Sequence, residues 1–126
     1  MNTKPNFPQR GEISWVDFNY KTQKGREIKK TRPSLVISND TQNEFDDQIM
    51  VAPLSSEEIE ISRSFEVLIL NTSESGLEKT SKILLNRVQT IDKKVRLKGL
   101  TGTANAEIME KVNKGLKLVL DLEQTG

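Results

Sequence analysis

The stretch Arg32-Pro-Ser-Leu-Val-Ile-Ser-Asn-Asp40 decides the fold, because it predicts a strand that is buried on both faces. Residues 35–37 form a short unbroken apolar run, which is typical of such strands. Pro33 has no N–H group, so we expect it at the first position of the strand, where no ladder hydrogen bond is lost. Because Pro33 also disfavours the α region for Arg32, the arginine should lie extended at the mouth of the strand. This is a rigid place for one cation, and it is equally compatible with a purely structural arginine at a strand edge.

Length and composition predict a single domain over residues 1–126, with a loose N-terminal arm over residues 1–8. The chain is 34% hydrophobic and 29% charged, which is typical of a soluble globular protein. No apolar run approaches the ~20 residues of a membrane span, and the N-terminus lacks the apolar core of a signal peptide. Cysteine is absent, which fits a reducing compartment. We therefore expect a cytoplasmic protein without a membrane partner.

The sequence contains neither histidine nor cysteine, and this restricts its chemistry. Zinc sites built on Cys or His, cysteine nucleophiles, Ser-His-Asp triads and RNA cleavage by paired histidines are all excluded. Catalysis would have to use Arg, Lys, Ser, Thr, Tyr, Asp or Glu, and we predict neither a metal site nor a cofactor. The net charge is only +1, so any attraction to nucleic acid must come from a local patch.

A positively charged loop over residues 19–31 leads directly into Arg32. It contains a single acidic residue, Glu27, and five basic ones: Lys21, Lys24, Arg26, Lys29 and Lys30. A solvated charged loop explains this composition, and so does a flap that follows a phosphate backbone. In the second case Tyr20 would stack on a base, as aromatic side chains do in single-strand binding.

Short apolar segments separated by polar turns predict a small antiparallel β-barrel. We expect strands over residues 11–18, 32–38, 48–54, 65–70 and 81–85, with residues 88–91 continuing the last strand or forming another. In the first strand the apolar positions change parity between Trp15 and Val16, which indicates cover on both sides or a bulge. Pro53 should mark the end of the third strand. Residues 39–47 are expected to form a polar turn, and residues 92–99 a basic connection.

The hydrophobic pattern becomes helical near the C-terminus and predicts a helix over about residues 105–122. Asn105 is a good N-cap, and Glu107 lies in the first turn, where it complements the helix dipole. Gly115 costs this helix roughly 1 kcal/mol relative to alanine. The apolar face of the helix should pack on the barrel, which gives a mostly β (α+β) fold.

Arg32 begins the second predicted strand and Ser55 follows the third. If these strands are antiparallel neighbours, a guanidinium and a hydroxyl share one rim of the barrel beside the basic loop. This pair suits a phosphodiester, because the arginine can hold the non-bridging oxygens and stabilise the charge of a pentavalent transition state. The serine can bond the ribose 2′-OH or a phosphate oxygen. The same residue types also occur together in proteins without such a site.

Several segments, in this order and spacing, resemble the MazF/PemK (Kid) toxins of type II toxin–antitoxin systems, the mRNA interferase family. They are residues 9–18 (QRGEISWVDF), residues 32–40 with Asn43, residues 51–55 (VAPLS), Gly76-Leu77 with Ser81, residues 89–92 (QTID) with Arg96-Leu97, and the apolar pattern of the final helix. The resemblance covers about residues 9–122, nearly the whole chain.

The resemblance implies an SH3-like/CcdB-type barrel with a C-terminal helix, assembled as a symmetric homodimer. It implies an endoribonuclease that cleaves single-stranded RNA, such as mRNA, at a short sequence without a metal. In such enzymes the ribose 2′-OH attacks the adjacent phosphate, leaving a 2′,3′-cyclic phosphate or 3′-phosphate and a 5′-OH. The family's catalytic arginine and Thr/Ser fall on Arg32 and Ser55. The implied protein partner is a cognate antitoxin whose disordered tail would lie in the RNA groove.

Two departures from the family pattern leave the proton transfers unassigned. Asn86 stands where several relatives have an acidic residue, and an amide cannot act as a general base. The histidine that one arm of the family uses in the first loop is also absent. Asn86 can still hydrogen-bond a base, Arg87 can contact phosphate, and Ser56 is the second candidate for the hydroxyl. Asp92 and Thr90 are expected to be structural, capping or pinning a turn.

Two other functions fit the sequence less directly. One is a non-enzymatic toxin on the same barrel, such as a gyrase poison, because one fold can host unrelated functions. That function would not require Arg32, Ser55 and a basic loop together. The other is an inactive relative that binds RNA or antitoxin without cutting, which Asn86 leaves open.

The basic loop generates a first testable prediction. Replacing Lys21, Lys24 and Lys30 with glutamine removes three cations, so RNA should bind more weakly. The slope of log K against log salt should flatten by about 2, given roughly 0.7 for each phosphate contact on a single strand. Anisotropy titrations of a cleavage-resistant RNA at several salt concentrations measure this slope. An unchanged slope would place the RNA elsewhere on the protein.

Overall fold

The computed structural model describes residues 5–18 and 30–122, and in these residues a seven-stranded sheet is combined with three α-helices. The strands are β1 (Glu12–Asp17), β2 (Thr31–Val36), β3 (Gln48–Ser55), β4 (Glu66–Ile69), β5 (Ser81–Leu84), β6 (Gln89–Asp92) and β7 (Leu97–Thr103). The helices are α1 (Asp40–Phe45), α2 (Lys93–Arg96) and α3 (Ala106–Val119), and a 3-10 turn, η1 (Leu85–Arg87), joins β5 to β6. The predicted mostly β fold with a C-terminal helix is confirmed.

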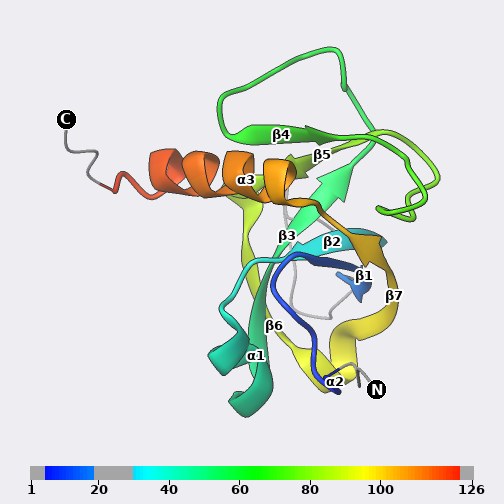
Figure 1. Cartoon of the computed structure of the whole chain (residues 1–126), viewed down its shortest axis with the longest axis vertical. Coiled ribbons are helices and arrows are strands. Elements are labelled where there is room, and N and C mark those ends of the chain that lie inside the picture. Colours follow the sequence, from blue (N-terminus) through cyan, green and yellow to red (C-terminus); the bar gives the residue numbers. More distant parts are fainter. Residues whose placement is uncertain (1–4, 19–29, 123–126) are drawn as a thin grey trace.

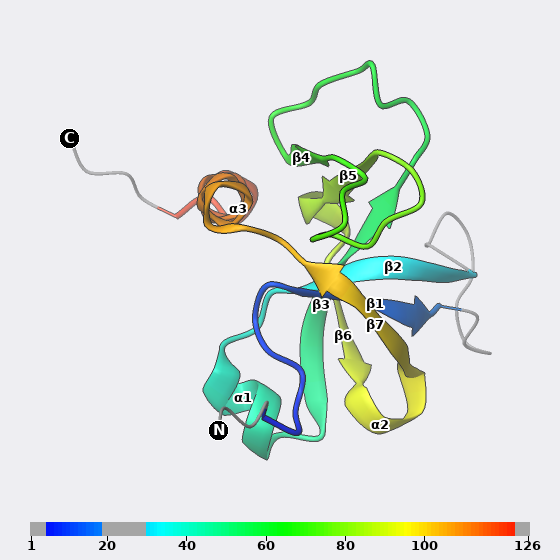
Figure 2. The same cartoon turned by 45° about the vertical axis from the view of Figure 1, so that its right-hand side comes forward.

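Strand β3 is the centre of the sheet. The strands follow the order β4-β5-β3-β2-β1-β7, with β6 paired to β3 beside this path, and every pairing is antiparallel. One edge of β3 pairs with β2, and the other pairs first with β6 and then with β5. In Figures 1 and 2, the β4–β5 hairpin and α3 lie at one end of the molecule, and α1 and α2 lie at the other. The sheet is therefore curved like a barrel but is not closed.

The apolar run of β2 is buried on both faces, as predicted. Leu35 and Val36 are both fully buried, yet they belong to different cores, because successive side chains of a strand point to opposite faces. Leu35 joins the core that α3 covers, whose buried members include Ile13, Ala52, Leu54, Val67, Ile69, Ile83, Leu85 and Val112. Val36 joins a second core, formed with Val16, Phe18, Ile49, Val51 and Ile91. The strand thus separates two hydrophobic cores.

The first strand is covered on both sides, which is one of the two interpretations of its parity change: Ile13 enters the first core, and Val16 enters the second. The register of β1 against β7 shifts between Trp15 and Val16. Val16 is fully buried, whereas Trp15 remains 37% exposed. The extra residue at this shift is Lys98, so the bulge belongs to β7. Trp15 and Val16 point to opposite faces because successive side chains of a strand alternate.

The predicted positions of the two prolines are wrong. Pro33 is the third residue of β2, and Pro53 lies inside β3, which continues to Ser55. Pairing of β2 with β3 begins only at Ser34, one residue after Pro33. On its other edge, Pro53 falls between the part of β3 that pairs with β6 and the part that pairs with β5. Each proline thus occupies a gap in one ladder, where its missing N–H removes no hydrogen bond.

Two segments that were expected to be irregular contain regular structure. Residues 39–47 include α1, because the Asn39 side chain caps its N-terminus and accepts a hydrogen bond from the Gln42 N–H at 2.8 Å. Residues 92–99 contain α2 and the start of β7. Asp92 caps α2 by accepting from the N–H groups of Lys94 and Val95, both at 2.9 Å, so its predicted capping role is confirmed. β7 contains two glycines and only two leucines, which gave no strand pattern.

The C-terminal helix forms where it was predicted. Asn105 caps α3 and accepts from the Ile108 N–H at 2.9 Å, and apolar side chains from Ile108 to Val119 pack on the first core. Gly115 is buried at the contact with η1, where an added Cβ would lie 2.4 Å from Leu85 Cδ1. The glycine therefore allows the helix to approach the barrel. Within residues 5–18 and 30–122, no helix is both long and apolar enough to span a membrane.

We predict that Gly115→Ala destabilises the protein, although alanine is the better helix former. Alanine would gain about 1 kcal/mol of propensity, but its methyl group meets the buried Leu85 side chain, and overpacking costs about 1–3 kcal/mol. Urea unfolding should show a net loss of roughly 1 kcal/mol. Lys114→Ala, at the exposed neighbouring position, should change the free energy of unfolding by less than about 0.5 kcal/mol. A stabilised Gly115→Ala protein would contradict the tight contact.

Candidate functional site

The register of β2 and β3 brings Arg32 and Ser55 to the same rim of the sheet. The two strands are antiparallel, and their ladder pairs Ser34 with Pro53. Continuing this register outwards sets Arg32 opposite Ser55. Both residues line the same two pockets, which meet at this rim. The two candidate catalytic residues therefore share one surface.

The first pocket is the more apolar of the two and has a volume of about 280 Å³. Trp15 lines it together with Pro33, Leu54 and Leu77. Its polar lining includes Lys30, Thr31, Ser56, Glu57, Glu78, Lys79, Ser81 and Thr101. Two of the predicted RNA-binding residues, Lys30 and Ser56, thus lie on this side of the rim.

The second pocket lies on the other side of Arg32 and Ser55 and is predominantly polar, with a volume of about 460 Å³. Two predicted RNA-binding residues, Asn86 and Arg87, lie in the 3-10 turn after β5 and line this pocket. The remaining lining comes from the segment after β3 and from β4 and β5: Glu57, Glu58, Arg63, Phe65, Glu66, Lys82 and Leu84. Charges of both signs therefore face this pocket.

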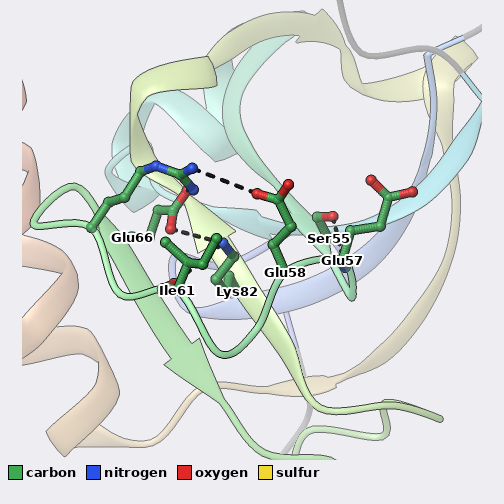
Figure 3. A network of polar contacts seen from close by, with 7 residues as sticks. Ser55, Glu57, Glu58, Ile61, Glu66 and Lys82 are labelled. Atoms are coloured by element: carbon green, nitrogen blue, oxygen red, sulfur yellow. Dashed lines mark hydrogen bonds and ion pairs between the residues drawn. The ribbon is translucent and has the colours of Figure 1, made fainter.

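A buried ion pair forms part of the second pocket (Figure 3). Lys82 Nζ lies 2.9 Å from Glu66 Oε1, and the two side chains are only 5% and 7% exposed. Lys82 is the register partner of Ser55 on the neighbouring strand, so the pair is anchored one strand away from the candidate hydroxyl. Lys82 also donates to the Ile61 carbonyl at 3.5 Å. The ion pair therefore links β4 to β5, and the bond to Ile61 holds the segment between β3 and β4 against β5.

Arg63 extends this network towards solvent. Its guanidinium contacts Glu66 Oε2 at 3.3 Å and Glu58 Oε2 at 3.5 Å. At the start of the same segment, Ser55 Oγ accepts a hydrogen bond from the Glu57 N–H at 3.1 Å. This bond holds Glu57 just beyond the end of β3, beside the candidate hydroxyl.

The structure describes six of the nine candidate site residues and places all six around the two pockets: Lys30, Arg32, Ser55, Ser56, Asn86 and Arg87. Tyr20, Lys21 and Lys24 lie outside the described residues. In the part of the chain that the structure covers, no three His, Cys, Asp or Glu side chains are grouped so as to hold a metal ion.

Sequence reasoning missed three features of this surface. Trp15 was assigned only to a strand, and the pattern gave no signal that its side chain lines a pocket, because Ile13 on the same face is fully buried. Lys82 lies in an otherwise buried strand, and a lysine in that position signals a buried counter-charge. Glu57 gave no signal, because it was one of several acidic residues in a loop.

Comparisons with known proteins identify relatives along nearly the whole chain. Residues 9–120 match the family described as PemK-like, MazF-like toxin of type II toxin-antitoxin system. The chain is 32% identical over 114 residues to endoribonuclease EndoA of Bacillus subtilis, covering 90% of this chain and 95% of that protein. It is 29% identical to endoribonuclease MazF of Staphylococcus saprophyticus, covering 90% and 92%.

Solved structures share the fold. MazF from Deinococcus radiodurans aligns with a TM-score of 0.77 at 23% identity, covering 94% of this chain and 100% of that chain. An endoribonuclease from a mycobacterial species, in complex with its cognate antitoxin, aligns with a TM-score of 0.76 at 21% identity, covering 94% and 99%.

The buried ion pair generates a prediction about stability. Glu66→Gln leaves the Lys82 ammonium buried without a full counter-charge, and breaking such a pair costs about 3–5 kcal/mol. Urea unfolding should therefore show a loss of about 3 kcal/mol. The double variant Lys82→Met/Glu66→Gln removes both charges and should recover most of this loss. A single variant as stable as the parent would mean that water reaches Lys82.

Proposed function

The chain belongs to the PemK-like, MazF-like toxins of type II toxin–antitoxin systems, and we propose that it cleaves RNA at the rim formed by Arg32 and Ser55. It is a MazF-like endoribonuclease toxin, since curated relatives that cover 90% of the chain are endoribonucleases. The observation that carries the proposed site is the shared position of Arg32 and Ser55 between two pockets. A phosphodiester bound there would have one pocket on each side.

Arg32 supplies the charge that this reaction needs. The guanidinium presents a fork of N–H donors that matches two oxygens of a phosphate. In cleavage the phosphorus becomes pentavalent and gains negative charge on its equatorial oxygens, so a fixed cation stabilises the transition state more than the ground state. Ser55 donates its hydroxyl hydrogen to a phosphate oxygen or orients the ribose 2′-OH. Ser56, in the first pocket, is the second candidate for this hydroxyl.

The proposed reaction is metal-independent. The ribose 2′-OH attacks the adjacent phosphorus and the 5′ oxygen leaves, giving a 2′,3′-cyclic phosphate, or the 3′-phosphate after hydrolysis, and a 5′-OH. Only single-stranded RNA can splay its nucleotides into two pockets on opposite sides of the scissile bond. We therefore propose mRNA as the substrate and the cytoplasm as the compartment.

The remaining candidate residues define a path for the RNA. Lys30 lines the first pocket and Arg87 the second, so cations flank the rim on both sides and can contact neighbouring phosphates. Asn86, also in the second pocket, has an amide that can bond a base edge. Tyr20, Lys21 and Lys24 remain predicted contacts from the loop that precedes Arg32.

We also propose a cognate antitoxin and a second copy of the chain as protein partners. A mycobacterial endoribonuclease of this fold has been solved in complex with its cognate antitoxin. We expect an antitoxin tail to occupy the same groove as RNA. Homodimer formation is supported by the edge strand β4, which exposes Leu68 and is followed by the exposed Leu70, and by α3, which contacts β4 and exposes Leu118.

The competing functions have less support. Curated relatives at 32% and 29% identity are endoribonucleases, which does not favour a gyrase poison. An inactive, RNA-binding relative would need no rigid placement of Arg32 opposite Ser55. An RNA cleavage assay of the wild-type protein distinguishes the endoribonuclease from the inactive relative.

We predict that Arg32→Ala lowers cleavage of a long defined RNA by at least about 100-fold, the loss typical of removing one charge-stabilising donor. Wild type, assayed with EDTA, should cut at one recurring short sequence and leave 5′-OH ends, which end mapping detects. Arg32→Lys keeps the charge but not the fork and should be intermediate. The melting temperature of Arg32→Ala should change little. Intact RNA with wild type, or a large fall in the variant's melting temperature, would contradict the assignment.

A further inference from the structure

The proposed reaction needs a group that takes the proton of the 2′-OH, and Asn86 cannot supply it. In the described residues, four carboxylates line the two pockets at the rim: Glu57, Glu58, Glu66 and Glu78. Glu66 contacts both Lys82 and Arg63, and Glu58 contacts Arg63. The carboxylates of Glu58 and Glu66 are already engaged by these cations, so they are less available to accept a hydrogen bond from the 2′-OH. Two candidates therefore remain.

Glu57 is distinguished from Glu78 by its position. Glu57 lines both pockets, as Arg32 and Ser55 do, whereas Glu78 lines only the first. Among the described residues, no cation lies within ion-pair distance of the Glu57 carboxylate. It is thus the carboxylate that is common to both sides of the rim and remains available to a ligand.

The backbone fixes Glu57 next to the candidate hydroxyl. Its N–H donates to Ser55 Oγ at 3.1 Å, so Glu57 follows the end of β3 in a defined turn. Figure 3 shows the Glu57 side chain beside Ser55, on the side away from Glu58. A carboxylate next to a phosphodiester would normally repel it. Here Arg32, Lys30 and Arg87 line the same pockets and offset that repulsion.

We propose that Glu57 is the general base of the cleavage reaction, an assignment that rests on the proposed function. The Glu57 carboxylate takes the proton from the ribose 2′-OH as the 2′ oxygen forms its bond to phosphorus. The bond from phosphorus to the 5′ oxygen breaks, and this oxygen takes a proton from water to become the 5′-OH. Glu57 then returns its proton to solvent, and the 2′,3′-cyclic phosphate is released. Arg32 holds the equatorial oxygens throughout.

The test is Glu57→Gln, which keeps the size and the backbone hydrogen bond but removes the base. Single-turnover cleavage of a defined RNA should slow by about 10²–10⁴-fold, the usual contribution of a positioned base. Binding of the same RNA with a 2′-deoxy nucleotide at the cut should stay within about threefold or tighten, because a negative charge is lost. Glu60→Gln, an exposed carboxylate of the same segment that lines neither pocket, is the matched control and should cleave like wild type.

A pH profile separates a base from a merely structural carboxylate. The wild-type rate should fall as pH is lowered and the base becomes protonated, and Glu57→Gln should lose this dependence. Formate should restore part of the rate of Glu57→Ala and none of the rate of Arg32→Ala. Glu57→Asp should retain more activity than Glu57→Gln.

Several results would overturn the assignment. One such result is a Glu57→Gln protein that cleaves within about threefold of the wild-type rate. Another is a Glu57→Gln protein that binds RNA weakly while its single-turnover cleavage rate is unchanged. Loss of the pH dependence in Glu78→Gln instead would give the role to that residue. If the wild type and Glu57→Gln both cleave while Arg32→Ala does not, only this inference is refuted and the proposed function stands. No cleavage by wild type refutes the proposed function and this inference with it.

Discussion

The burial of β2 on both faces is the constraint on which the rest of the structure depends. Leu35 enters the core beneath α3 and Val36 enters the second core, so a slip of one residue would exchange them and place each against the wrong partners. The register with β3 is therefore fixed at Ser34 opposite Pro53. That register carries Arg32 to a position opposite Ser55. The location of the candidate site follows from hydrophobic packing several residues away.

The rim departs from the rules that the rest of the fold obeys. Lys82 and Glu66 place two charges where apolar side chains of similar size would be at least as stable. Trp15 is a large apolar side chain that remains 37% exposed at the first pocket. Both departures occur at the pockets that share Arg32 and Ser55. Residues that lower stability are expected to gather at a functional site, because side chains there are selected for their chemistry and not for their packing.

The sequence was informative where hydrophobic pattern determines structure. Apolar runs predicted β1 to β5 within a few residues, and the helical period with Asn105 predicted α3. β7 was missed because its glycines and polar residues show no alternation of apolar and polar positions. It becomes a strand through its pairing with β1. The rim of Arg32 and Ser55 was predictable because both lie at strand ends. The contacts of Lys82 and Glu66 depend on the register of β4 and β5, which no local pattern specifies.

The two pockets give the proposed site a chemical asymmetry. A phosphate held at Arg32 and Ser55 has the more apolar pocket with Trp15 on one side and the polar pocket with Asn86 on the other. An indole face accepts any base by stacking, whereas an amide discriminates through the donors and acceptors of a base edge. In the proposed site, the nucleotides on the two sides of the scissile bond would therefore be read by different interactions. Selection of a short RNA sequence then requires no large interface, because one rim combines the reacting groups with two unlike pockets.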